Sequence, residues 1–132
     1  MGQTQILVRR SVRHDVSIRG VLSIAPEHTG MVLFGPNSGA KDGWIECDCV
    51  DFSLGGVGVM AQVFVPRLAR VHVKLFSAGE EPRPVLEATC VVRRTIMTDR
   101  RPMYNLGCSF IEMTESSQRQ VERLMTLLSS EA

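Results

Sequence analysis

The sequence predicts an all-β domain, a small antiparallel barrel or sandwich, that ends in one helix. Apolar residues alternate with polar ones in a series of short segments, a pattern typical of strands with one buried face. Clusters of glycine, proline and polar residues separate these segments and predict turns. The last segment changes to a helical period. Because strands and helices do not alternate along the chain, a parallel doubly wound sheet is disfavoured.

The strands are expected in order along the chain. The first covers about residues 16–25, where apolar side chains occupy alternate positions. The same alternation predicts further strands around Ile45–Cys49, Val71–Leu75, Leu86–Arg93 and Tyr104–Phe110.

The connections are predicted from glycine, proline and polar clusters at 35–39, 77–82 and 99–102. The stretch 35–43 is expected to be the longest exposed loop.

The C-terminal segment predicts an amphipathic helix. Thr114 is placed to cap its N-terminus, and Glu115 suits the positive end of its dipole. Such a helix is expected to cover one opening of the barrel, although its apolar stripe could instead bind a partner helix. The stripe recurs at helical spacing and consists of Val121, Leu124, Met125 and Leu128.

The four cysteines are interpreted as reduced core residues. All of them fall on the apolar faces of their segments, and none forms a C-x-x-C pair. A zinc site is the alternative, but the usual ligand spacing is missing. The cysteines are Cys47, Cys49, Cys90 and Cys108.

The bulk composition fits one globular domain. The chain has 132 residues, of which 44% are hydrophobic and 22% charged. A net charge of +1 gives no general attraction to DNA or to an anionic membrane, so any anion site must be local. Neither a secretory signal nor an apolar run near the roughly 20 residues of a membrane helix is visible. A cytoplasmic protein without membrane insertion is therefore expected.

A basic motif precedes the first strand. Arg9, Arg10 and Arg13 form an R-x-x-x-R pattern with an extra arginine inside it. Guanidinium groups bind phosphate and the O6/N7 edge of guanine, and they stack on bases. A solvated basic stretch near a terminus is the alternative interpretation.

A second motif, D-x-S-x-x-G, joins two strands. Asp51 ends one strand and Gly56 opens the next, Val57–Met60. Asp51 could accept hydrogen bonds from guanine N1–H and N2–H, and Ser53 could bond nearby backbone. Gly56 would allow close backbone approach or a positive φ. An ordinary turn with local capping is the alternative interpretation.

Other candidate residues carry weaker signals. His14 could stack on a base, but an exposed bystander is the simpler interpretation. Arg93 and Arg94 could add a ligand contact, or they could be solvated charges on a strand. Trp44 is interpreted as a core or core-edge residue. Without a P-loop, a dinucleotide glycine pattern, a catalytic triad or a metal helix, no enzyme and no metal site is expected.

The two motifs together, about forty residues apart, resemble those of the PilZ domain family. Val91–Arg94 resembles the family's late strand and Tyr104–Phe110 its closing G-x-x-F strand. Residues 114–128 resemble the helix that follows. The resemblance covers about residues 8–128, nearly the whole chain.

The resemblance implies a six-stranded antiparallel β-barrel of split-barrel type with a C-terminal helix. It also implies binding of cyclic di-GMP. Residues 1–15 would form an arm that carries the first motif, and residues 16–132 would form the barrel and helix. The ligand would be held by Arg9, Arg10, Arg13, Asp51, Ser53 and Gly56.

The expected function is that of a non-enzymatic cyclic di-GMP receptor. It would change conformation on binding and signal to a partner protein in control of motility, exopolysaccharide or biofilm formation. Binding of one nucleotide or of an intercalated pair stays open. One alternative is a PilZ-fold adaptor that binds a protein but no nucleotide. Another is a barrel that binds single-stranded nucleic acid, which the 5% aromatic content disfavours.

Overall fold

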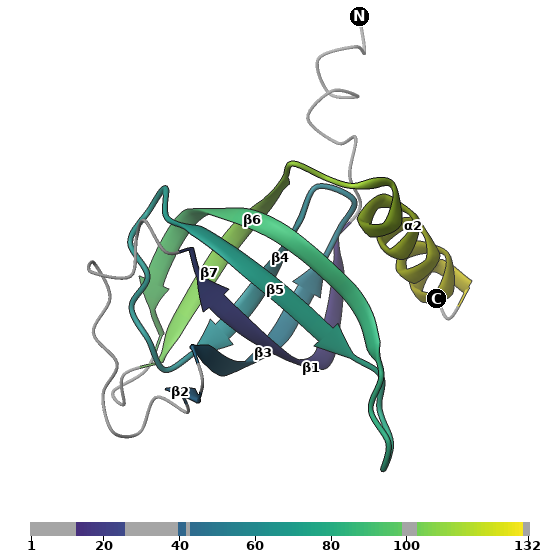
Figure 1. Ribbon diagram of the computed structural model, residues 1–132, viewed down its shortest axis with the longest axis horizontal. Coiled ribbons are helices and arrows are strands. Elements are labelled where there is room, and N and C mark those ends of the chain that lie inside the picture. The colour runs from purple at the N-terminus through teal and green to yellow at the C-terminus, as the bar shows by residue number, and fades with distance from the viewer. Residues whose placement is uncertain (1–12, 26–39, 42, 99–102, 131–132) are drawn as a thin grey trace, which may run out of the picture.

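The structure is a computed structural model, and it describes residues 13–25, 40–41, 43–98 and 103–130. Within these residues the strands precede a C-terminal helix, as Figure 1 shows. The elements in chain order are β1 (His14–Ile24), β2 (Ala40–Lys41), β3 (Trp44–Phe52), β4 (Gly56–Ala61), β5 (Arg70–Phe76), β6 (Pro84–Met97), β7 (Tyr104–Ile111) and α2 (Glu115–Ser130).

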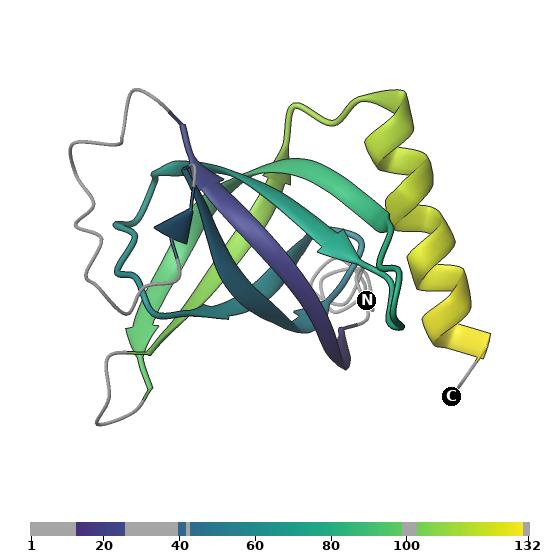
Figure 2. The ribbon, with the colours of Figure 1, turned by 60° about the horizontal axis from the view of Figure 1, so that its bottom comes forward.

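Six of these strands close into an antiparallel barrel, which confirms the expected fold class. The order around the barrel is β1-β5-β6-β7-β4-β3, and pairing of β1 with β3 completes the circle. The short strand β2 pairs only with the start of β3. Figure 2 shows the strands wrapping around a common interior.

The barrel interior is filled by the residues that alternate inward along each strand. Leu22, Ile45, Val59 and Leu86 are fully buried there. Because an inward position recurs at every second residue, the alternation in the sequence was sufficient to predict which strand face is buried.

The cysteine prediction is confirmed, since all four cysteines are free and buried in this interior. Burial, with a smaller contribution from neighbouring negative groups, raises the pKa of Cys47, Cys49 and Cys108 to about 12. The pKa of Cys90 also lies well above its ordinary value, for the same main reason.

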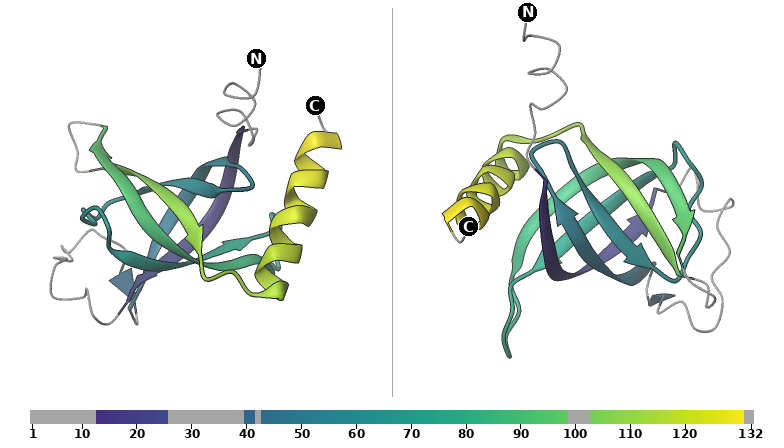
Figure 3. Two further views of the ribbon diagram at one scale, coloured as in Figure 1. Left: turned by 90° about the horizontal axis from the view of Figure 1, so that it is seen from above. Right: turned by 180° about the vertical axis from the view of Figure 1, so that it is seen from behind.

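The helix α2 closes one end of the barrel, as the sequence predicted. The Thr114 hydroxyl accepts a hydrogen bond from the Ser117 backbone N–H at 3.0 Å, which confirms the N-cap. The Ser117 hydroxyl donates to the backbone carbonyl of Glu87 in β6 at 2.6 Å. Leu124 and Val121 are buried against the barrel. Figure 3 shows the helix at the end of the barrel where β1 begins.

Two expectations differ from the structure or lie beyond it. The first strand begins at His14 rather than near residue 16, because His14 and Asp15 pair with Phe52 and Asp51 of β3. Because His14 and Asp15 are polar, the alternation of apolar residues could not locate this start of the strand. The expected long loop at 35–43 lies largely outside the described residues.

Candidate functional site

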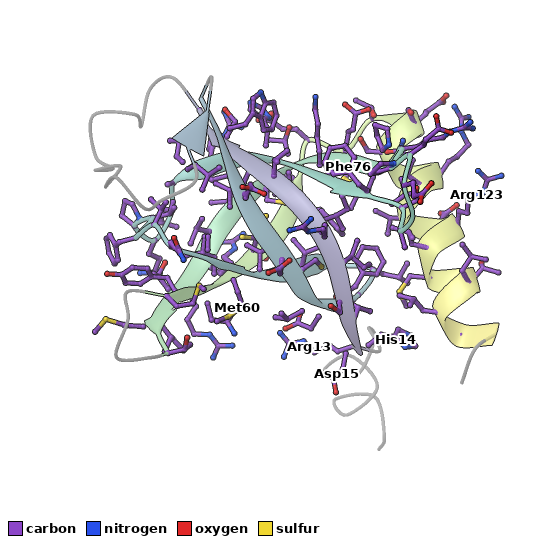
Figure 4. All side chains as sticks on the ribbon, turned by 90° about the horizontal axis from the view of Figure 1, so that it is seen from below. Arg13, His14, Asp15, Met60, Phe76 and Arg123 are labelled. Atoms are coloured by element: carbon purple, nitrogen blue, oxygen red, sulfur yellow. The ribbon has the colours of Figure 1, made fainter. Side chains whose placement is uncertain are left out.

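Parts of the two motifs lie together at the barrel end that α2 covers. Arg13 directly precedes β1, and Asp51 lies near the end of β3, the strand that pairs with β1. An Arg13 guanidinium nitrogen lies 3.8 Å from Asp51 Oδ1. Figure 4 shows Arg13 at the start of β1. Arg9 and Arg10 lie outside the described residues.

A β-bulge places the Asp51 side chain on the outside of the barrel. The register between β3 and β4 shifts between Cys49 and Asp51, so one additional residue, Val50, is inserted. In a regular strand Asp51 would face inward with Cys49. The bulge instead turns Asp51 outward and leaves Phe52 fully buried.

The pair formed by Arg13 and Asp51 is exposed and loosely held. The Arg13 side chain retains 65% of its accessible surface and that of Asp51 retains 26%. An ion pair at this separation and exposure contributes at most about 1 kcal/mol to stability. Both groups are therefore accessible to a ligand that could replace one partner by a stronger contact.

Ser53 organises the turn that follows Asp51. Its hydroxyl accepts a hydrogen bond from the Gly55 N–H at 3.2 Å. Its backbone N–H donates to the Gly56 carbonyl at 3.0 Å. These bonds are the local capping that the turn interpretation of the motif anticipated.

Gly56 is required by contact with β7 rather than by its backbone dihedral angles. A Cβ atom at this position would overlap the carbonyl oxygen of Cys108. Among the described glycines only Gly43 and Gly79 have a positive φ, so a positive φ at Gly56 was the wrong explanation. The bond from the Phe110 N–H to the Gly55 carbonyl, 2.9 Å long, holds the same turn against β7.

Gly58 lies beside Asp51 in the candidate site, and the sequence interpretation missed it. It pairs with Asp51, and a Cβ at Gly58 would overlap the Asp51 carboxylate. The carboxylate thus occupies the space above a residue without a side chain. A glycine in the middle of a strand indicates close approach of other atoms, and this signal could have identified Gly58.

The residues with weaker signals in the sequence lie at different places on the barrel. They are His14, Trp44, Arg93 and Arg94. His14 is half-buried on the inward side of β1, and its Nε2 is buried without a hydrogen-bond partner in the described structure. The interpretation of His14 as an exposed bystander is therefore wrong. Arg93 and Arg94 are exposed on β6. Trp44 is half-buried at the barrel edge, with Lys74 Nζ 4.6 Å from its ring centroid.

The contact between Arg13 and Asp51 lies outside the large hollow beside the helix. That hollow, about 940 Å³ in volume, lies among β1, β3, β4, the β5–β6 hairpin and α2, and Ile18, Met60 and Leu127 are among its lining residues. Neither Arg13 nor Asp51 lines it. Within the described residues, no cluster of three or more His, Cys, Asp or Glu side chains could hold a metal. No helix described here is long and apolar enough to span a membrane.

Solved structures share this architecture at low sequence identity. Bacillus subtilis MotI/DgrA, an inhibitor of motility, aligns over 94% of this chain with a TM-score of 0.62 and 14% identity. The PilZ domain of Escherichia coli YcgR with c-di-GMP aligns over 93% with a TM-score of 0.58 and 14% identity. The K. pneumonia MrkH–c-di-GMP complex aligns over 93% with a TM-score of 0.63 and 18% identity.

The chain spans about half of two of these solved chains, 52% of both MotI/DgrA and MrkH, but 92% of the YcgR PilZ domain. No curated protein matches it significantly. The family model for the PilZ domain matches residues 7–127, which include both motifs, all six barrel strands and most of the helix. The chain therefore belongs to the PilZ domain family.

Proposed function

We propose that this protein is a cyclic di-GMP receptor that signals to a partner protein rather than catalysing a reaction. The observation that carries the proposal is the 3.8 Å contact between Arg13 and Asp51, one residue from each motif. The YcgR and MrkH complexes with c-di-GMP, which share this fold, support the choice of ligand.

In this proposal Asp51 and the turn after it provide the rigid half of the site. The carboxylate accepts hydrogen bonds from N1–H and N2–H of one guanine, which suits an acceptor-only group. The bulge, the Ser53 hydrogen bonds and the tight contact of Gly56 with β7 hold this half before the ligand arrives. Such preorganisation lowers the entropy cost of binding.

Arg13 provides the adaptable half of the site together with Arg9 and Arg10 on the arm that precedes β1 in the sequence. When the ligand binds, the Arg13 guanidinium exchanges its exposed contact with Asp51 for a ligand phosphate or guanine. The arm folds onto the ligand in the same step. Since α2 covers the same end of the barrel, this movement changes the surface beside the helix and thereby the surface available to a partner.

Titration calorimetry with cyclic di-GMP tests this function. The wild-type protein should bind with a dissociation constant near or below about 1 μM. Arg13→Ala and Asp51→Ala should each weaken binding by about 1.5–3 kcal/mol, the range for a hydrogen bond to a charged group. Arg67→Ala is the matched control, because Arg67 is an exposed arginine in the β4–β5 connection at the opposite end of the barrel.

The same titration separates the receptor from its alternatives. If the wild-type protein gives neither heat nor a thermal shift at ligand concentrations far above about 1 μM, the receptor proposal is wrong. A partner captured equally well with and without the nucleotide would then support the adaptor. Salt-dependent binding of an oligonucleotide would support the nucleic-acid barrel.

A further inference from the structure

We propose that the outer barrel wall beside Asp51 is the second half of the nucleotide site, and that Arg94 on this wall reads the second guanine. The inference rests on the proposed function and adds a specificity-determining residue to it. It follows from the strand register, from two glycines and from a β-bulge in β6, none of which belongs to the two sequence motifs.

One row of paired residues runs outward from Asp51 across four strands. Asp51 in β3 pairs with Gly58 in β4, Gly58 pairs with Gly107 in β7, and Gly107 pairs with Arg94 in β6. Paired residues share a face of the sheet. The residues flanking Gly58 are Val57 and Val59 of the core, so this row faces outward.

The two glycines leave the middle of this row without side chains. A Cβ at Gly107 would have the Arg94 Cβ, 3.7 Å away, as its nearest neighbour, which is an ordinary contact, so this position could hold a side chain without a clash at Cβ. With strands about 4.8 Å apart, the backbones of Asp51 and Arg94 lie about 14 Å from each other. The Asp51 carboxylate lies over Gly58, so the floor between this acceptor and the Arg94 donor is the backbone at Gly107.

The outer barrel wall is continuous with the end of the barrel where Arg13 lies. The next row along the strands contains Met60, which pairs with Asp48 and with Asn105 and therefore borders the floor. Figure 4 shows the labelled side chains of Met60 and Arg13 on the same side of the barrel. A ligand bound by Arg13 can therefore extend along the outer wall of the barrel and over the floor.

A bulge in β6 presents two consecutive arginines to this wall. The register shifts between Val92 and Arg94, so Arg93 is the inserted residue. In a regular strand one of two successive side chains would face the core, but both arginines are exposed. Arg93 Nε donates to the Ser109 hydroxyl at 3.4 Å, which directs it along the wall.

The charge of this pair of arginines is available to a ligand. In the part of the chain that the structure describes, no carboxylate lies within ion-pair distance of Arg93 or Arg94. An arginine fork donates to both O6 and N7 of guanine, whereas adenine presents a donor amino group in place of O6. Arg94 at the end of the glycine floor therefore discriminates guanine from adenine, while Asp51 reads the other base.

The test compares cyclic di-GMP with the mixed dinucleotide cyclic GMP-AMP by calorimetry. The wild-type protein should prefer cyclic di-GMP by about tenfold to a hundredfold, the value of one bidentate base contact. In Arg94→Met the affinity for cyclic di-GMP should fall, and the ratio of the affinities for cyclic di-GMP and cyclic GMP-AMP should approach one. Arg67→Met is the control and should keep both affinities and the ratio.

A second variant tests the floor independently of the arginine. Gly107→Leu covers the backbone at this position with a side chain, and its Cβ meets only ordinary contacts, so the fold is expected to survive. It should weaken binding of cyclic di-GMP at least tenfold while the melting temperature stays close to that of wild type.

The outcomes distinguish this inference from the proposed function. If Arg13→Ala weakens binding but Arg94→Met and Gly107→Leu bind like wild type with an unchanged ratio, the second half-site is refuted and the receptor stands. If the wild-type protein binds neither dinucleotide, both proposals fail. Loss of the ratio in Arg94→Met alone, with a normal Arg67→Met, supports the assignment.

Discussion

Replacement of Gly58 by alanine should displace the Asp51 carboxylate without unfolding the barrel. The new Cβ would overlap the Asp51 side chain, which is short and cannot retract far. The carboxylate must therefore rotate to another position and lose its approach to Arg13, now 3.8 Å away. The backbone at Gly58 has no positive φ, so alanine itself fits the strand.

The cost to stability should be small because opposing terms nearly cancel. Displacing Asp51 into a poorer rotamer costs about 0.5–1.5 kcal/mol, and the lost surface ion pair contributes at most about 1 kcal/mol. Alanine in place of glycine inside a strand stabilises the folded state by roughly 0.5–1 kcal/mol. We therefore expect the free energy of unfolding, measured with urea, to change by less than about 2 kcal/mol. Binding of cyclic di-GMP should weaken by about 1.5–3 kcal/mol.

A double-mutant cycle decides whether Gly58 acts through Asp51. Gly58→Ala is measured by calorimetry in the wild-type protein and again in Asp51→Ala, where there is no carboxylate to displace. If the reasoning holds, the second measurement shows almost no additional loss of affinity. Additive losses, or wild-type affinity in Gly58→Ala alone, would refute it.

Three further perturbations test the fold around the site. Gly56→Ala should destabilise by about 1–3 kcal/mol or more in urea, because its Cβ would overlap the β7 backbone at Cys108. Thr114→Ala should cost about 0.5–2 kcal/mol, since the α2 N-cap bond to Ser117 is lost, and Thr114→Ser should restore it. The thiols of Cys47, Cys49 and Cys108 have pKa values raised from 9.0 to about 12, so unfolding releases their protons above pH 9. Stability should therefore be complete below about pH 9 and fall between pH 9 and 12, and a urea series without this loss would contradict their burial as neutral thiols.

Much of the barrel was predictable because each strand has one buried face. The alternating apolar positions located the strands around Ile45–Cys49 and Val71–Leu75, and the structure extends them by a few residues. The helix was predictable from its period and from Thr114. The start of β1 was not, because the pairing of Asp15 with Asp51 involves no apolar side chain.

The wall beside the motifs was the least predictable part of the site. Bulges at Val50 and Arg93 depend on how one strand registers against its neighbours, and no local pattern encodes that. The pairing of Gly58 with Gly107 joins strands that lie far apart in the sequence. A single glycine within a strand gives only a weak signal until its partner is known.

The division of the site into a fixed part and an exchangeable part follows from where its residues lie. Asp51 is held by a bulge and a paired glycine within the barrel, whereas Arg13 lies just outside β1 and is 65% exposed. A ligand that engages Asp51 must break only the loose contact with Arg13, which costs at most about 1 kcal/mol. It regains this through a charge-assisted bond from the released guanidinium to its own phosphate or base, worth about 1.5–3 kcal/mol. The balance favours exchange, so for the proposed ligand we expect the arginine, at the end of the barrel that α2 covers, to be the residue that moves on binding.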